Sequence, residues 1–335
     1  MRYICNMDFR TKIEITRQEP QINHMTKMML FGSCFSENIG GKLKDYKFDV
    51  DVNPFGILYN PLSILSNIER LIEKRNFEDD DIVEHNGIYQ SFMHHGDFSD
   101  VNKSLCLSKI RTSFDKACEA VMKTDVFLFT FGTAYIFRLK ETNEVVANCH
   151  KFPAATFERE RLTVEQIVDK WSGLIDKLLE NNPNVRMIFT VSPIRHWKDG
   201  AHENNVSKAI LHLAIDNLKL KYPKSVIYFP AYEIVMDELR DYRFYANDMM
   251  HPSAVAVEYI WERFGDAFLS EQTIGIGNEW RRIRQAMEHR PINPNSESHR
   301  AFLKQTLSKL IEYDNKYPFI NLTDEIKNLT ERIEK

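Results

Sequence analysis

The strongest constraint on the fold comes from two short runs that are almost entirely apolar. They read VFLFTF at residues 126–131 and RMIFTV at residues 186–191. A strand with one wet face alternates apolar and polar residues, whereas a continuous apolar run is typical of a strand covered on both faces, as in a parallel sheet. Shorter runs at 28–31, 48–52 and 226–229 indicate further strands, and helical patterns lie between them at 37–44, 62–75, 103–123, 164–180 and 203–221. Because parallel strands need crossovers, this alternation predicts an α/β fold with helices on both faces of one sheet, a three-layer α/β/α sandwich.

Composition and charge narrow the class of partner. The chain has 335 residues, 43% of them hydrophobic, which is enough for a large core. Its formal net charge is −4, and neither sign forms a long block. This balance argues against nucleic acid or an anionic membrane as partner and predicts a small-molecule substrate.

The N-terminus and the cysteines predict a reducing compartment. The apolar part of the opening stretch MRYICNMDFR is too short for a signal peptide. No run of 18 apolar residues, the length of a transmembrane helix, occurs, so we expect a cytoplasmic protein. The five cysteines are odd in number and irregular in spacing, without a CxxC pair. We therefore expect neither a disulfide framework nor a cysteine zinc site, and no metal or cofactor.

Two segments interrupt or extend the alternating pattern. Residues 78–101 carry the turn signal Asn86-Gly87, which predicts an inserted hairpin that covers a site like a lid. A second hairpin is expected just after residue 131. The sequence turns polar and helical after residue 268, so we expect a main domain over 1–268 and a C-terminal helical extension over 269–335. The extension packs on the main domain or on a partner, which makes an oligomer through these helices one expectation.

Unusual polar residues follow the ends of the predicted strands, where ligands bind in doubly wound sheets. In chain order these are Gly32-Ser33-Cys34, Asn53, Gly56, Gly132-Thr133, Arg195-His196 and, before a late helix, Asp248 and His251.

Together these residues suit acyl transfer. Cys34 falls at a helix N-terminus, where the helix dipole is expected to lower a thiol pKa. The N–H groups of Cys34 and Gly56 and the Thr133 hydroxyl are candidate donors to an oxyanion. Asp248 and His251, three residues apart, fit an imidazole general base and the carboxylate that orients it.

Each feature also has a structural interpretation. Ser33 or Ser36 can simply cap a helix, Pro252 suits the first turn of one, and Thr133 can end a strand. His94 and His95 on the insert indicate a packed loop more often than a metal site, although an insert folded over the sheet edge would let them line a pocket. Arg195 fits either a salt bridge or an anionic part of a substrate.

The order of these blocks resembles the SGNH (GDSL-type) hydrolase superfamily and, within it, the GSCFA family. The resemblance rests on GSCFS at residues 32–36, NPFGILYNP, FTFGTAYIF, TVSPIRHWKDG, NNVSKAIL and the Asp-x-x-His spacing, over about residues 24–267. It implies a flavodoxin-like parallel sheet with Cys34 as nucleophile, Gly56 as an oxyanion donor and His251 with Asp248 as base and orienter. The sequence departs from the SGNH pattern twice: Ser33 stands where that pattern has aspartate, and its third-block asparagine is absent, with Thr133 or Ala134 in its place.

The resulting prediction is hydrolysis of an ester or thioester bond in an acylated small molecule or glycan. Cys34 is the first choice of nucleophile, Ser33 the second and Ser36 the last. Two alternatives stay open: an acyltransferase on the same fold, and a catalytically degenerate protein that binds a glycan or small molecule. A scaffold that binds partners through the C-terminal helices is a third.

Overall fold

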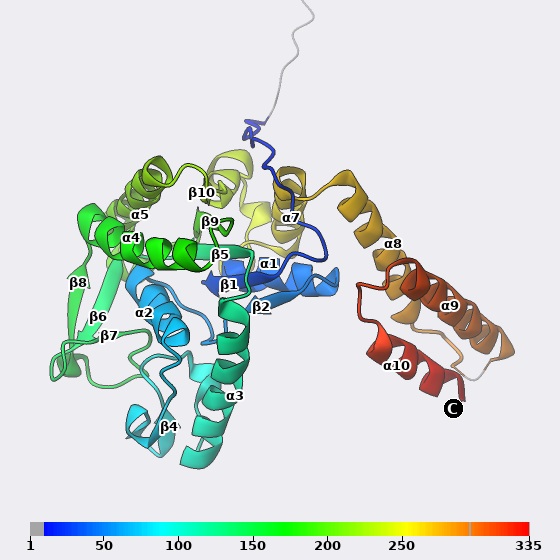
Figure 1. Cartoon of the computed structure of the whole chain (residues 1–335), viewed down its shortest axis with the longest axis horizontal. Helices are drawn as coiled ribbons and strands as arrows, with labels where there is room; N and C mark the ends of the chain where they lie inside the picture. The colour runs from blue at the N-terminus through cyan, green and yellow to red at the C-terminus, as the bar shows by residue number, and fades with distance from the viewer. Residues whose placement is uncertain (1–9, 295, 335) are drawn as a thin grey trace, which may run out of the picture.

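The computed structural model describes residues 10–294 and 296–334 (Figure 1). Cys5 and the first nine residues of the predicted main domain lie outside the described residues. The strands are β1 Met28–Gly32, β2 Val50–Val52, β3 Val83–His85, β4 Ile88–Gln90, β5 Val126–Phe131, β6 Tyr135–Leu139, β7 Val145–Val146, β8 Phe157–Arg161, β9 Arg186–Val191 and β10 Val226–Tyr228. The α-helices are α1 Cys34–Asp45, α2 Pro61–Ile72, α3 Lys103–Val121, α4 Val164–Asn181, α5 Ala201–Lys221, α6 Ala231–Glu233, α7 Ala254–Phe268, α8 Glu271–Met287, α9 Glu297–Lys316 and α10 Thr323–Glu334.

The predicted α/β fold is confirmed, with a five-stranded parallel sheet at its centre. Its strand order is β10-β9-β5-β1-β2, which is the flavodoxin-like order 2-1-3-4-5 when only the strands of this sheet are counted. The two apolar runs form β5 and β9, and every residue of both strands is buried. In this order the chain reverses direction across the sheet between β1 and β5, so the residues that follow these two strands lie side by side.

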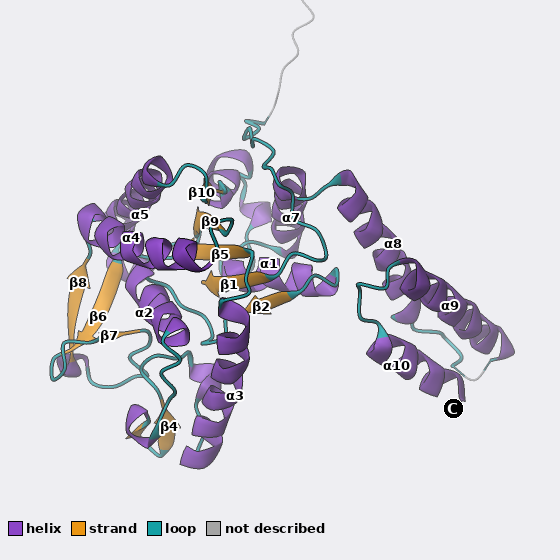
Figure 2. Ribbon diagram, viewed as in Figure 1, coloured by secondary structure: helices purple, strands orange, loops and turns teal. Residues whose placement is uncertain are grey.

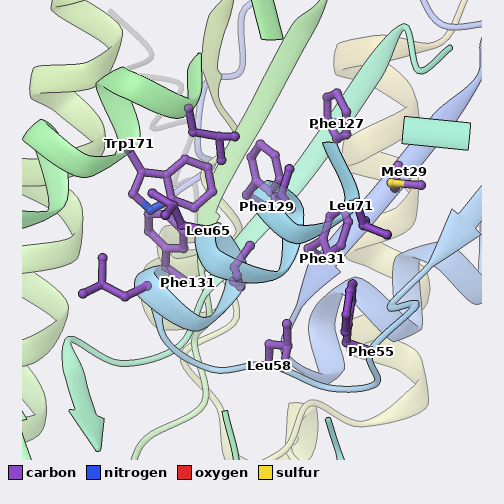
Figure 3. Packing of buried hydrophobic residues seen from close by; sticks show 14 of the residues in the cluster. Met29, Phe31, Phe55, Leu58, Leu65, Leu71, Phe127, Phe129, Phe131 and Trp171 are labelled. Carbon is purple, nitrogen blue, oxygen red and sulfur yellow. The ribbon is translucent and has the colours of Figure 1, made fainter. Parts of the chain in front are cut away.

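The two faces of the sheet are covered by different helices. Met29 and Phe31 of β1 pack in one cluster with residues of α2, α3, α4 and α5. Phe129 of β5 and Trp171 of α4, whose side chains lie together in Figure 3, belong to the same cluster. Met28 and Leu30, on the other face of the same strand, pack with α1 and α7. This alternation of side chains along β1 produces the three layers.

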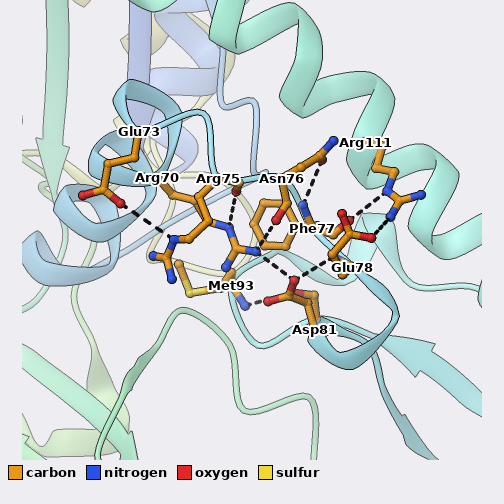
Figure 4. A network of polar contacts seen from close by, with 10 residues as sticks. Arg70, Glu73, Arg75, Asn76, Phe77, Glu78, Asp81, Met93 and Arg111 are labelled. Atoms are coloured by element: carbon orange, nitrogen blue, oxygen red, sulfur yellow. Dashed lines mark hydrogen bonds and ion pairs between the residues drawn. The ribbon is translucent and has the colours of Figure 1, made fainter.

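The predicted hairpin over residues 78–101, here called the insert, is present as β3 and β4. Asn86 and Gly87 form its turn, both with positive φ. A buried arginine of α2, Arg70, fixes the start of the insert: its guanidinium donates to the carbonyls of Arg75 and Asn76 and to Asp81 (Figure 4). Because a buried cation is stable only when its donors are satisfied, this network ties the insert to the main domain.

A second small sheet has the order β7-β6-β8 (Figure 2). The sequence predicts its first two strands as a hairpin. It does not predict β8, whose residues FERER alternate too weakly to be distinguished from a loop.

Helices α8, α9 and α10, here called the C-terminal helices, have a hydrophobic cluster of their own and lie at one end of the molecule (Figure 1). They contact the C-terminal end of α1, where the Trp280 indole donates to the Asp45 carbonyl at 2.7 Å and Arg284 pairs with the Asp45 carboxylate at 2.9 Å. Helix α7 ends at Phe268 and α8 begins at Glu271; the domain boundary at residue 268 stays a prediction. Among the described residues, no helix combines the length and apolarity that a membrane crossing requires.

Gly32 is the position at which the turn after β1 tolerates no side chain. Its φ is +143°, and a Cβ there would lie 2.4 Å from the Thr130 carbonyl oxygen. We expect Gly32→Ala to lower the free energy of unfolding by about 2 kcal/mol or more, because the strained backbone and the clash act together. Urea denaturation followed by circular dichroism measures this change.

Gly41 of α1 provides the matched control, since an added Cβ there meets nothing within 4 Å. Gly41→Ala should raise the free energy of unfolding by roughly 0.5–1 kcal/mol through helix propensity. Equal midpoints for the two variants would contradict this account of the turn.

Candidate active site

The turn between β1 and α1 presents one reactive side chain and buries two hydroxyls. Ser33 is the N-cap of α1; its Oγ accepts from the Phe35 N–H at 3.3 Å, and the residue is 1% exposed. Ser36 is fully buried and hydrogen-bonds the Phe31 carbonyl and the Thr130 hydroxyl. Cys34 is half-buried. Of the three candidate nucleophiles, Cys34 is therefore the one that a substrate reaches most easily.

The surroundings of Cys34 raise its pKa, whereas the sequence predicted a lowered one. Burial is the largest cause, and the negative charge of Glu37 one turn along α1 adds to it. The backbone N–H of Cys34 itself opposes the shift but does not outweigh it. Burial disfavours the thiolate by more than the helix N-terminus favours it. The resting side chain is therefore a neutral thiol that needs a base.

The two further oxyanion donors named from the sequence are engaged in holding the fold. The Gly56 N–H donates to the Asn53 carbonyl at 2.7 Å, and a Cβ at Gly56 would lie 2.3 Å from the Cβ of His95. The Thr133 hydroxyl is hydrogen-bonded to the Ser207 hydroxyl at 3.2 Å and accepts from the Tyr135 N–H. The Gly56 N–H is therefore taken by the protein, and the Thr133 hydroxyl is held between Ser207 and the Tyr135 N–H.

Asn53, at the end of β2, holds the turn that precedes Cys34. Its Oδ1 accepts from the Gly32 N–H at 3.0 Å, and its own N–H donates to the Leu30 carbonyl at 2.9 Å. Asn53 adopts φ +48°, a left-handed conformation that asparagine tolerates better than most residues. Its role in this geometry is to position the Gly32–Cys34 turn.

Asp248 and His251 form a hydrogen-bonded pair in the loop before α7. Asp248 Oδ2 lies 2.6 Å from His251 Nδ1, and Oδ1 accepts from the N–H groups of Met250 and His251, each at 2.9 Å. These donors, the backbone ones first, lower the pKa of Asp248 to about 2. An ionised carboxylate at Nδ1 keeps the proton on that nitrogen and leaves Nε2 free to act as a base.

The loop that carries His251 lies against the first turn of the helix that begins at Cys34. Phe35 and Pro252, the chain neighbours of Cys34 and His251, line one small apolar hollow together with Pro193. Within residues 10–294 and 296–334, no hydrogen bond joins the Cys34 thiol to His251. The two side chains thus come from adjoining segments, and apo sites often tighten such contacts only when substrate is bound.

The residues after β9 lie at the same edge of the sheet. His196 stacks edge-on against Tyr59 with ring centroids 5.8 Å apart, and burial lowers its pKa to about 4. The Tyr59 carbonyl accepts from the N–H groups of Gly132 and Thr133 at 2.7 and 3.0 Å. Arg195 donates to the Asn205 side chain at 3.2 Å and faces a large surface groove.

The two histidines of the insert differ in their surroundings. His94 is 1% exposed among the rings of Phe55, Phe77 and Phe98, and burial lowers its pKa to about 3. His94 therefore belongs to the core of the insert and does not line a pocket as the sequence suggested. His95 is partly exposed, with Nδ1 2.9 Å from the Asp97 carboxylate. Among the described residues, no group of three histidines, cysteines or acids is arranged to hold a metal.

Sequence reasoning missed a buried polar row on α5. Lys208 is 2% exposed, and its ammonium donates to the carbonyls of Gly132 and Ser192, which directly follow β5 and β9. Burial lowers its pKa to about 7. Ser207 donates or accepts at Thr133 and accepts from the Ala134 N–H at 2.8 Å. The available signal was the block NNVSKAIL, which places polar residues on the apolar face of a predicted helix.

The raised pKa of Cys34 gives a direct pH prediction. A thiol whose pKa is raised stays protonated further into the alkaline range, so iodoacetamide should alkylate Cys34 in the free protein with a midpoint above the ordinary value of about 8.5. Peptide mass spectrometry against pH measures this midpoint. A midpoint below that of a free thiol would show that the helix N-terminus dominates after all.

Comparison with known proteins gives two family matches and a distant similarity to solved structures. The sequence model of the GSCFA family matches residues 27–264, and that of the GSCFA domain protein, C-terminal domain, matches residues 280–335. None of the curated proteins compared matches the chain. An acetyl xylan esterase, Est2A, from the rumen bacterium Butyrivibrio proteoclasticus is similar in structure at 11% identity and a TM-score of 0.35, with 72% of this chain and 63% of that one covered. The chain thus spans less than two thirds of that esterase, and so distant a likeness carries no argument about activity.

Proposed function

This chain belongs to the GSCFA family, and from that premise we propose that it is an acyl hydrolase whose nucleophile is the Cys34 thiol. The observation that carries the proposal is the Asp248–His251 pair, held at 2.6 Å on a loop that shares a hollow with the first turn of α1. A carboxylate that orients an imidazole, on a loop that adjoins the turn bearing a half-buried thiol, suits nucleophilic acyl catalysis.

The proposed reaction has two steps. His251 Nε2 takes the proton from the Cys34 thiol as sulfur attacks the acyl carbonyl carbon, and Asp248 stabilises the imidazolium that forms. The tetrahedral intermediate expels the alcohol or thiol, which receives that proton, and leaves the acyl group on Cys34. Water, deprotonated by His251, then attacks the acyl-enzyme and releases the carboxylic acid and the thiol.

In this proposal, backbone N–H groups in the first turn of α1 stabilise the oxyanion, because Gly56 and Thr133 are hydrogen-bonded within the protein. The first N–H groups of a helix have no partner within it and carry partial positive charge. Loss of one donor typically costs about 10²–10³ in rate. The site therefore favours thioesters and activated esters, whose carbonyl carbons are attacked more readily than those of ordinary alkyl esters.

A second candidate is a binding protein without catalysis. The raised pKa of Cys34 and the engagement of both further donors favour it. An acyl hydrolase forms an acyl-enzyme at Cys34, whereas a binding protein does not.

The deciding experiment incubates the protein with 4-nitrophenyl acetate and with acetylpantetheine, quenches it in acid and maps acetylation by peptide mass spectrometry. We expect acetylation at Cys34, with release of the leaving group, and little at Cys118, a half-buried cysteine of α3 that serves as an internal control. Equal labelling of both cysteines, or none at Cys34, would favour the binding protein.

A further inference from the structure

A surface groove of about 680 Å³ adjoins the Asp248–His251 pair. Its lining comes from three segments: the loop after β9, the stretch around residues 236–245, and Asp248 to Met250 of the histidine loop. Pro193 lines both this groove and the hollow beside Phe35. A ligand in the groove therefore lies next to the segments that carry Cys34 and His251.

Two arginines of the groove, Arg195 and Arg240, have no anionic partner among the residues that the structure describes. Arg195 donates only to the neutral Asn205 side chain and stands 5.8 Å over the Trp197 ring. Arg240 is exposed, and within the described ranges neither arginine forms an ion pair. Two guanidinium groups from separate segments, both facing one groove, suit a multiply charged anion.

The acidic residues of the groove are already compensated. Asp241 pairs with Arg243 at 3.6 Å, and Asp248 accepts from His251 and from two backbone N–H groups. Their charges therefore oppose an anion at Arg195 and Arg240 less than unpaired carboxylates would.

The groove also presents flat ring faces. Trp197 is 51% exposed and Tyr242 is 76% exposed, so both rings are accessible to a ligand in the groove. Exposed aromatic faces stack on planar bases and on the apolar faces of sugar rings.

We propose that this groove binds the phosphate-bearing, ring-containing part of the acyl substrate, so that the substrate class is an acyl ester or thioester of a phosphorylated carrier. The assignment rests on the proposed function and names its substrate. Phosphate fits because it carries nearly two negative charges and three acceptor oxygens, which match two guanidinium forks. Two sources share this chemistry: a nucleotide-bearing thiol carrier and a sugar phosphate.

The test measures binding apart from catalysis, by titration calorimetry on the Cys34→Ala variant. Three probes separate the sources: acetyl-coenzyme A, an O-acetylated sugar phosphate, and acetylpantetheine, which has no phosphate. We expect one phosphate-bearing probe to bind at least about 10-fold more tightly than acetylpantetheine, with Arg195→Gln and Arg240→Gln each weakening it about 10-fold. Arg300→Gln, on the exposed face of α9, is the matched control and should leave binding unchanged.

Equal affinity for all three probes, or equal losses in the two groove variants and in Arg300→Gln, would overturn the proposal. Acetylation of Cys34 by acetylpantetheine reports on the chemistry alone. If that acetylation occurs while the arginine variants bind normally, the substrate assignment fails and the acyl hydrolase stands. If arginine-dependent binding occurs without any acetylation, the acyl hydrolase fails, and the groove is a phosphate-binding site without an acyl substrate.

Discussion

Cys34→Ala is expected to lower kcat/KM for thioesters and activated esters by at least about 10³-fold, the largest effect that we predict. The thiol is the half-buried group at the turn, whereas the hydroxyls of Ser33 and Ser36 are buried and hydrogen-bonded. Alanine removes the nucleophile without a new clash, so the variant should fold. Steady-state hydrolysis of acetylpantetheine, read by thiol release, measures the loss.

Ser33→Ala separates this account from a serine mechanism. Ser33 caps α1, so its loss should cost about 1 kcal/mol of stability while leaving most of the activity. A variant that lacks Ser33 and is inactive although folded, beside an active Cys34→Ala, would identify Ser33 as the nucleophile.

His251→Ala is expected to lower the same rate by about 10²–10⁴-fold, as loss of a general base does. The effect should be large because burial raises the pKa of the Cys34 thiol, so little thiolate exists at neutral pH without a base. The residual rate of the variant should rise with pH towards that raised thiol pKa.

Asp248→Asn is the companion variant. Its amide can no longer hold the proton on Nδ1 through a charged hydrogen bond, so we expect a loss smaller than that of His251→Ala. Added imidazole should partly rescue His251→Ala and not Cys34→Ala. If His251→Ala keeps its activity and its pH profile, His251 is not the base.

The fold was largely predictable because burial is expressed directly in the sequence. The runs at 126–131 and 186–191 coincide with β5 and β9, and the helix expected over 164–180 is Val164–Asn181 in the structure. Strand β8 was missed since its residues FERER are mostly polar, and pairing with β6 makes it a strand. The local pattern of apolar and polar residues predicts strands and helices that bury a full face. It does not predict an edge strand that forms only by pairing with a neighbouring strand.

The site was less predictable because the state of each group depends on distant atoms. The hydroxyl that hydrogen-bonds Thr133 belongs to Ser207, 74 positions later in the chain. The carbonyl that accepts from the Gly56 N–H belongs to Asn53, whose left-handed φ is not predictable from the sequence pattern. The pKa of Cys34 follows from how deeply the turn is buried. Residue types and spacing therefore suggested the candidate residues. Only the structure shows how burial shifts the pKa of Cys34 and which donors are already hydrogen-bonded.

The surroundings of Ala134 limit which side chains this turn can carry. Its side chain is fully buried and its N–H is held by the Ser207 hydroxyl. An asparagine there would overpack a closed site and bury an amide beside Ser207, at a cost of about 1–3 kcal/mol from packing alone. An asparagine at this position would therefore require coordinated changes in the turn between β5 and β6 and on α5, where Ser207 lies.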